Sequence, residues 1–67
     1  MNLFPQRLRE LRFEKGYSQK QLAQLINTTD DSIFSWEKGR SQPSIEMILA
    51  LCKALEISAD YLLGLED

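Results

Sequence analysis

The sequence predicts an all-α fold, a compact bundle of five helices that forms a single domain over residues 1–67. Three observations lead to this prediction. Apolar residues recur at helical spacing along most of the chain. A serine or threonine stands at four candidate helix starts, and a glycine or asparagine stands at four expected helix ends. A chain of this length buries only about 60% of its unfolded surface, so it can form only one small core.

The first helix is expected to begin at about Leu3 or Pro5 and to end at Lys15. Proline suits a first turn, because its missing N–H would be unpaired there in any case. Gly16 ends the helix, since glycine readily adopts the left-handed conformation that follows a last turn. The inward-facing residues of this helix are expected to be Leu8, Leu11 and Phe4.

A second helix is expected to begin at Ser18, because Ser18 and Gln21 have the spacing of a capping box. Asn27 should end it, since asparagine tolerates the left-handed conformation better than most residues. The apolar face of this helix is expected to consist of Leu22, Ala23, Leu25 and Ile26. The small side chain of Ala23 lies where this helix would approach the next one.

A third helix is expected to follow Thr29, which is a favourable N-cap residue. Its buried face should hold Ile33 and Trp36 with Glu37 beside them, and Gly39 should close it. Only about three residues separate the second and third helices, which is the spacing of a helix-turn-helix. That unit places its second helix in the major groove of DNA.

A loop is expected over residues 40–43, because the residue before a proline is pushed out of helical conformation. Ser44 then caps a fourth helix that runs to about Leu55, and Ser58 caps a short fifth helix that ends at Gly64. Leu62 is expected to close the core from this last helix. The core positions expected on the fourth helix are Ile45, Ile48, Leu51 and Leu55.

The landmarks of the whole chain stand in one order with no obvious gaps. They are Arg12, Lys15-Gly16-Tyr17-Ser18-Gln19, Leu22-Ala23, Ile33, Trp36-Glu37-Lys38-Gly39-Arg40, Gln42-Pro43, Leu51, Ala54-Leu55 and Asp60-Tyr61-Leu62-Leu63-Gly64. From about Arg7 to Gly64 the chain resembles the phage repressor and Cro family, the XRE-type transcriptional regulators.

The resemblance implies a bundle of the lambda-repressor type, with a helix-turn-helix at about residues 18–38 formed by the second and third helices. It also implies a sequence-specific DNA-binding transcriptional regulator. Such a protein would be a repressor that binds a palindromic operator in double-stranded DNA as a homodimer.

The charge balance is unusual for that function. Eight basic and ten acidic residues leave a net charge of −2 at pH 7, whereas DNA binders usually carry a basic footprint that neutralises phosphates. The local arrangement matters more than the total. Lys20, Lys38 and Arg40 flank the expected helix-turn-helix. The last third of the chain holds many of the acids, namely Glu46, Glu56, Asp60, Glu66 and Asp67.

Several other classes of protein are disfavoured by the composition. The sequence has no histidine, no activated nucleophile and no carboxylate pair suited to a cleft, so we expect no enzyme, no metal site and no cofactor. A small-molecule sensor would not fit in this length. Cys52, the single cysteine, excludes an internal disulfide and should be a small buried hydrophobic residue. No apolar run approaches membrane length, so we expect a cytoplasmic protein with no signal peptide or anchor.

Arg12 and Glu37 form the first candidate pair for the functional site. In the resembling family, an arginine on the first helix meets a glutamate at the end of the third, and both residues stand at matching positions here. Such a pair would tie the third helix to the rest of the bundle. The alternative is two independent surface charges.

The candidate phosphate contacts lie at two places. Ser18 and Gln19 would stand at the start of the second helix, where free N–H groups and the helix dipole favour an anion. Gln19 also matches a family position that reaches a phosphate or a base edge. Lys38, Arg40 and Gln42 belong to the loop that resembles the family's second phosphate clamp. The alternatives are that Ser18 only caps a helix and that Lys38 and Arg40 are merely solvated.

The candidate base contacts, besides Gln19, face outward on the third helix, and Lys38 shares that face. They are Asp30, Asp31, Phe34 and Ser35. Family members commonly place glutamine, arginine, serine or lysine there. A carboxylate could accept a hydrogen bond from cytosine N4, or the two aspartates could only stabilise the helix start. Phe34 could meet a thymine methyl, anchor a protein partner, or be partly buried against the second helix.

The end of the chain offers more apolar surface than a small bundle needs. Tyr61, Leu63 and Leu65 are candidate contacts with a second copy. A two-fold dimer would place its recognition helices about 34 Å apart on DNA. A second interpretation of the chain is a protein-interaction module, an antitoxin-like partner or adaptor on the same fold, which would use Phe34 and the acidic helix face.

Overall fold

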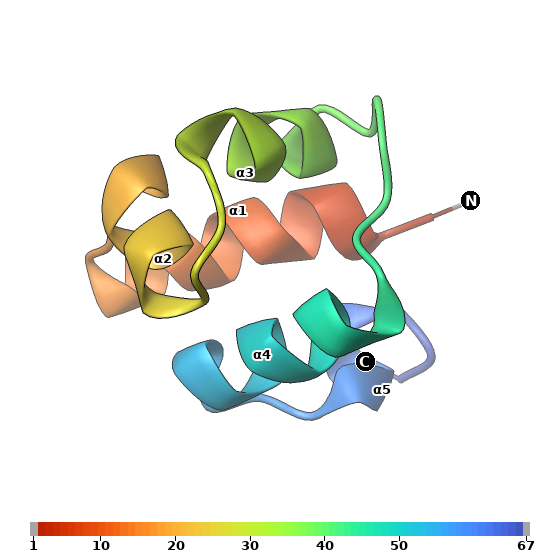
Figure 1. Cartoon of the computed structure of the whole chain (residues 1–67). Helices are drawn as coiled ribbons and strands as arrows, with labels where there is room; N and C mark the ends of the chain where they lie inside the picture. The colour runs from red at the N-terminus through yellow and green to blue at the C-terminus, as the bar shows by residue number, and fades with distance from the viewer. Residues whose placement is uncertain (1, 67) are drawn as a thin grey trace.

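The computed structural model describes residues 2–66 and contains five helices and no strand in that range. The predicted all-α bundle is therefore confirmed. In Figure 1, α1 runs through the middle of the molecule, with α3 on one side of it and α4 and α5 on the other, while α2 lies at one end. The helices are α1 (Phe4–Lys15), α2 (Gln19–Leu25), α3 (Asp30–Glu37), α4 (Ile45–Leu55) and α5 (Ala59–Leu62).

Side-chain caps start four of these helices, as the sequence predicts. In each case a serine or threonine oxygen accepts a hydrogen bond from the backbone N–H three residues later. This bond satisfies one of the N–H groups that a first helical turn leaves unpaired. The four cap residues are Ser18, Thr29, Ser44 and Ser58.

Left-handed residues follow four helices where they are expected, at Gly16, Asn27, Gly39 and Gly64, and one helix where none is expected. Gly16 has φ 75° after α1, and Asn27 has φ 62° shortly after α2. Helix α4 ends at Leu55 and is followed by Glu56, which has φ 57° although it is not a glycine. The carboxylate of Glu56 pairs with the ammonium of Lys15, so the exposed end of α4 is linked to the end of α1.

The core lies on the inner faces of all five helices. The largest side chains that are fully buried come from every helix, and Leu62 of α5 is among them with no exposed surface, as predicted. Helix α1 contacts α3, α4 and α5, so it joins the two sides of the bundle. The buried apolar residues are Phe4, Leu8, Leu11, Leu22, Ala23, Ile26, Ile33, Trp36, Leu51, Leu55 and Leu62.

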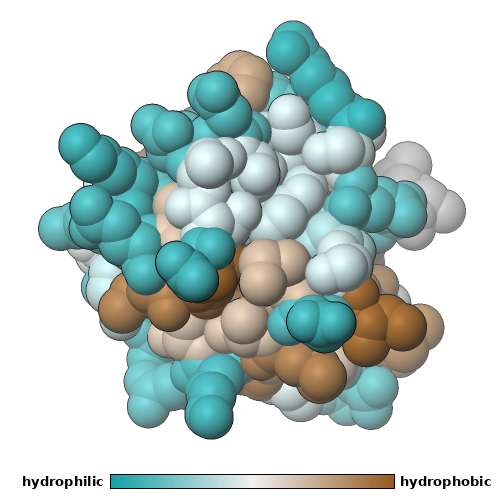
Figure 2. Space-filling model, in the orientation of Figure 1, coloured by the Kyte–Doolittle hydropathy of each residue, from teal (hydrophilic) through white to brown (hydrophobic). Residues whose placement is uncertain are grey.

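Two predicted core residues are instead exposed. Ile45 is 80% exposed and Leu25 is 57% exposed. Each is a terminal residue of its helix and lies where no neighbouring helix covers its side chain. The solvent-facing side of α4 also carries Leu49, which is 62% exposed. Figure 2 accordingly shows a band of hydrophobic surface across the lower half of the molecule, in the region of α4.

Cys52 is a free thiol that packs against the core. It is only partly buried, whereas the sequence predicts a buried residue. Burial raises the pKa of this thiol.

Within residues 2–66, none of the helices combines the length and the apolarity needed to cross a membrane.

Candidate nucleic-acid interface

Helices α2 and α3 are joined by a sharp turn over residues 26–29. The turn follows the left-handed conformation of Asn27, and the N–H of Thr28 donates to the carbonyl oxygen of Ala23 at 2.9 Å. Ala23 is 2% exposed, so its small methyl side chain is buried in the core beside this turn. The geometry is that of a helix-turn-helix.

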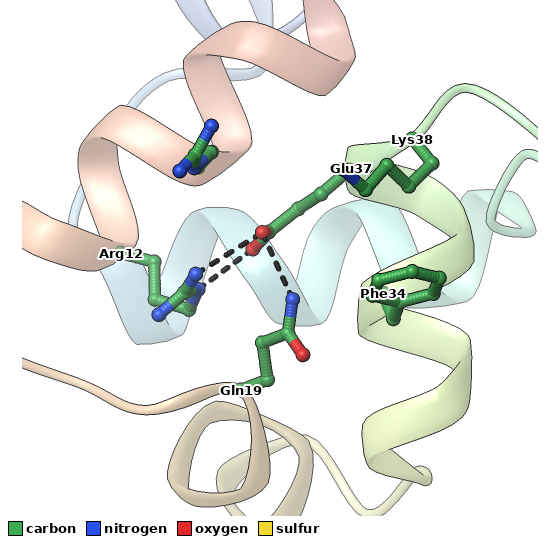
Figure 3. Close-up of a pocket in the computed structure, with 6 residues that line it drawn as sticks. Arg12, Gln19, Phe34, Glu37 and Lys38 are labelled. Atoms are coloured by element: carbon green, nitrogen blue, oxygen red, sulfur yellow. Dashed lines mark hydrogen bonds and ion pairs between the residues drawn. The ribbon is translucent and has the colours of Figure 1, made fainter.

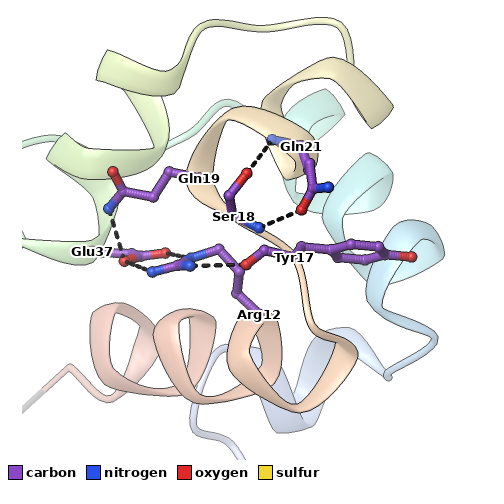
Figure 4. Close-up of polar contacts among 6 residues, drawn as sticks. All are labelled: Arg12, Tyr17, Ser18, Gln19, Gln21 and Glu37. Atoms are coloured by element: carbon purple, nitrogen blue, oxygen red, sulfur yellow. Dashed lines mark hydrogen bonds and ion pairs between the residues drawn. The ribbon is translucent and has the colours of Figure 1, made fainter.

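Ser18 forms a complete capping box with Gln21. Its Oγ accepts from the N–H of Gln21 at 3.0 Å, and its own N–H donates to Gln21 Oε1 at 2.8 Å. The expectation that Ser18 offers a free backbone N–H is therefore wrong, because the Gln21 side chain already occupies that donor. Its role at the start of α2 is that of a cap (Figure 4).

Arg12 and Glu37 meet in a bidentate ion pair between α1 and the last residue of α3. Arg12 Nε donates to Glu37 Oε2 at 2.7 Å, and Nη2 donates to Oε1 at 3.1 Å. The two side chains are only 8% and 4% exposed. Arg12 Nη1 also donates to the carbonyl oxygen of Tyr17 at 2.9 Å, which ties the α1–α2 connection to the same guanidinium (Figure 4).

Gln19 joins this ion pair from α2. Its Nε2 donates to Glu37 Oε1 at 3.2 Å, so one carboxylate receives hydrogen bonds from two other helices. Figure 3 shows the guanidinium and the amide converging on Glu37 from different sides. No buried side-chain N or O within residues 2–66 lacks a hydrogen-bond partner, and the network holds α3 in a defined position relative to α1 and α2.

The outward face of α3 is left uncovered by the bundle. Asp30 and Asp31 are exposed in its first turn, after the Thr29 cap, and Ser35 is half-buried. Acidic residues in a first turn stabilise a helix through its dipole. The structure therefore brings the candidate base-contacting residues of α3 onto one open surface.

Phe34 is 38% exposed and stands among cations. Lys38 Nζ lies 5.6 Å from the centroid of its ring, and Arg40 Cζ lies 5.5 Å from it. These separations are within the range of cation–π attraction. The ring also lines a cavity together with Gln19 of α2, so the side chain is partly covered at the junction of the helices.

That cavity includes Arg9, a residue of α1 that sequence reasoning missed. Arg9 is exposed and stands three residues before Arg12, so the two side chains point in similar directions from the helix. The three-residue spacing from Arg12 is the only feature of the sequence that indicates a place for Arg9 at this site. The cavity is lined by Arg9, Arg12, Gln19, Phe34, Glu37 and Lys38.

The loop after α3 places two of the predicted phosphate contacts, Arg40 and Gln42, in different surroundings. Gly39 has φ 72°, and the N–H of Arg40 donates to the carbonyl oxygen of Ser35 at 2.9 Å. This turn holds Arg40 close to α3. Gln42 lies farther along and lines a different cavity, with Pro43 and other residues, so the structure does not bring it to the Phe34 ring.

The candidate dimer contacts lie in and after α5. Leu63 and Leu65 are 38% and 73% exposed, whereas Tyr61 is half-buried. The Arg7 guanidinium stands 4.1 Å from the centroid of the Tyr61 ring and donates to the carbonyl oxygens of Tyr61 and Glu66. Arg7 therefore holds the end of the chain against α1.

Within residues 2–66 there is no group of three or more His, Cys, Asp or Glu residues that could hold a metal ion.

The Lys15–Glu56 pair is exposed. The hydrogen bond between them raises the pKa of Lys15 and lowers the pKa of Glu56.

Several known transcriptional regulators are similar to this chain in sequence. A family model described as helix-turn-helix matches residues 8–62. The chain is 33% identical over 61 residues to the HTH-type transcriptional regulator ImmR of Bacillus subtilis, and the match covers 91% of this chain and 48% of ImmR. An uncharacterized HTH-type transcriptional regulator of the same organism, YgzD, is also 33% identical over 61 residues, with 91% and 92% covered. The chain thus spans about half the length of ImmR and nearly all of YgzD.

Comparison with solved structures gives the same family. The c2 repressor of Salmonella phage P22, solved in complex with a synthetic operator, superposes with a TM-score of 0.92 at 33% identity. The superposition covers 98% of this chain and 100% of that chain. With a matching family model, similar relatives and the same helix-turn-helix geometry, the chain belongs to the helix-turn-helix family of phage-repressor and Cro-like transcriptional regulators.

Proposed function

We propose that this chain binds double-stranded DNA sequence-specifically and regulates transcription, acting as a repressor by occluding its operator. The observation that carries this proposal is the buried network of Arg12, Glu37 and Gln19. It fixes α3 against two other helices, while the outward face of α3 stays open to solvent. A rigidly held helix with an uncovered outer face is what insertion into a major groove requires.

In this proposal the outward residues of α3 read base edges, and two neighbouring groups contact phosphates. The base contacts are Asp30, Asp31, Phe34 and Ser35, with Gln19 beside them. The phosphate contacts are the hydroxyl of Ser18 and the side chain of Gln19 near the start of α2, and Lys38, Arg40 and Gln42 after α3. The likeness to the P22 c2 repressor, which was solved with its operator, supports this arrangement.

We further propose that the protein acts in the cytoplasm as a homodimer on a palindromic site, without a catalytic activity, a cofactor or a small-molecule ligand. The exposed Leu63 and Leu65 would meet the same residues of a second copy. Two-fold symmetry would then give two recognition helices that match the two halves of the operator.

Binding to duplex DNA at different salt concentrations tests the proposal. We expect measurable affinity for random duplexes at about 50 mM salt and a steep fall as salt rises, because bound cations release counterions from phosphates. Selection from a random duplex library should then enrich a palindromic sequence. Absence of any binding at about 50 mM salt would refute DNA binding.

One observation favours a second function, that of an antitoxin-like or adaptor module. The exposed Asp30 and Asp31 place two negative charges on the face of α3 that would approach phosphates. Carboxylates and phosphates repel each other, whereas a basic protein partner would attract this face. A chain that binds no duplex DNA but captures a basic partner through Phe34 would match this alternative.

A further inference from the structure

A cationic cavity lies beside the recognition helix, between α1 and the end of α3. Arg9 and Arg12 line it from α1, and Lys38 lines it from the first residue after α3. Its free space is about 260 Å³. It is open on one side, so a group carried by a larger molecule can enter it.

Two of these three cations have no anionic partner within the described part of the chain. Arg12 is neutralised by Glu37, with which it forms a bidentate pair. Arg9 and Lys38 form no ion pair within residues 2–66. Among residues 2–66, the only carboxylate that lines the cavity belongs to Glu37 and is already paired, so the remaining charge of these lining residues is positive.

Phe34 forms an apolar wall of this cavity on the side of Lys38. Its ring lies 5.6 Å from Lys38 Nζ, while the guanidinium of Arg9 lies 5.5 Å from the ring of Phe13 on α1. Each cation therefore stands next to an aromatic ring in addition to solvent. Because Phe34 lines the cavity, its contact with Lys38 favours conformations in which the Lys38 ammonium stays beside the cavity.

We propose that Arg9 and Lys38 together bind a single phosphate of the DNA backbone in this cavity, with Phe34 as its apolar wall. The proposal rests on the proposed DNA-binding function and adds α1 to the surface that contacts DNA. The proposal also explains how a chain with a net charge of −2 can approach the phosphates of DNA. Unpaired cations are gathered where a phosphate would lie, so the acidic total does not oppose binding there.

The salt dependence of DNA affinity tests whether the two cations share one phosphate. Affinity of the full chain for a random duplex is measured by fluorescence anisotropy between about 50 and 200 mM salt. The variants are Arg9→Gln, Lys38→Gln and the double variant. Each phosphate contact contributes about 0.9 to the slope of log K against log salt.

We expect the double variant to lower that slope by about 0.9, the contribution of one phosphate. All sequences should be weakened alike. A decrease of about 1.8 would mean two separate phosphates and would refute the shared site. An unchanged slope would refute it as well while leaving the DNA-binding function intact, whereas a wild-type chain that binds no duplex would refute both.

A matched control and a second probe complete the test. Lys53→Gln removes an exposed lysine of α4, on the other side of α1, and should leave the slope unchanged. Circular dichroism should show that all variants are folded. Duplex DNA should shift the NMR resonance of the Arg9 Nε–H group, whereas millimolar inorganic phosphate should not. An equal shift with inorganic phosphate would assign the cavity to the free ion and overturn the backbone assignment.

Discussion

The carboxylate of Glu37 is held from two sides, by the guanidinium of Arg12 on α1 and by the amide of Gln19 on α2. Because Glu37 is the last residue of α3, these contacts fix the orientation of the recognition helix. A buried ion pair adds little net stability compared with apolar residues of the same size, because desolvation opposes the attraction. Its effect is on geometry.

Arg12→Met should destabilise the fold strongly. Among residues 2–66, the substitution leaves the buried Glu37 carboxylate with Gln19 as its only side-chain partner, and an uncompensated buried charge costs roughly 3–5 kcal/mol. Urea denaturation measures this change. The double variant Arg12→Met with Glu37→Leu should regain most of the lost stability. A loss below about 1 kcal/mol for the single variant would mean that the pair behaves as an exposed one.

Asp31→Gln should change the base preference of the protein. A carboxylate can accept a hydrogen bond from cytosine N4, whereas glutamine pairs with adenine through two hydrogen bonds. Selection from a random duplex library before and after the substitution reads out the preferred sequence. If the variant merely binds every sequence more tightly, Asp31 does not read a base and serves only the helix start.

Arg40→Ala should weaken binding to all sequences equally. Arg40 is exposed in the loop after α3, and its guanidinium lies near the Phe34 ring, so it can reach a phosphate. Loss of that contact should reduce the salt slope by about 1. Anisotropy titrations on two unrelated duplexes test this expectation. A loss that is confined to one duplex would contradict a role in phosphate binding.

The Lys15–Glu56 pair should contribute to stability only over a defined pH range. The pKa of Glu56 is lowered by its hydrogen bond to Lys15. Its contribution is therefore present above the unfolded-state pKa of about 4.3 and is lost as pH falls through the lower folded-state pKa. The pKa of Lys15 is raised, so its contribution is present below about pH 10.4 and is lost as pH rises through the folded-state value.

Thermal unfolding of the wild type and of Glu56→Gln at several pH values measures this contribution. Glutamine has nearly the same size, so the comparison isolates the charge at a residue with φ 57°. The difference in Tm should be constant near neutral pH and should vanish in acid. A difference that persists in strong acid would show that the charge is not its source.

Leu65→Asp should prevent self-association. Leu65 is 73% exposed, so the substitution leaves the core intact, while two facing aspartates would repel each other across a two-fold axis. Sedimentation should show a dimer for the wild type and a monomer for the variant. Lys53→Gln, on the exposed side of α4, is the control. A wild-type chain that remains monomeric at high micromolar concentration would exclude the dimer.

The sequence by itself determined the helices and their starts. Four of the helix starts depend on a hydrogen bond between a side chain and a backbone group three residues away, as at Thr29, and such contacts are encoded locally. The inward stripes of α1 and α3 also follow from periodicity, because Leu8 and Ile33 recur with other apolar residues at helical spacing and are fully buried.

Only the tertiary structure decided which residues are covered by a neighbouring helix. Ile45 and Leu62 are both aliphatic residues at helical spacing, yet Ile45 is 80% exposed and Leu62 is fully buried. The structure likewise placed Arg9 in the same cavity as Lys38, and it brought Gln19 to Glu37. These relationships join residues that are far apart in the chain, so they depend on the packing of helices against one another, which local spacing does not specify.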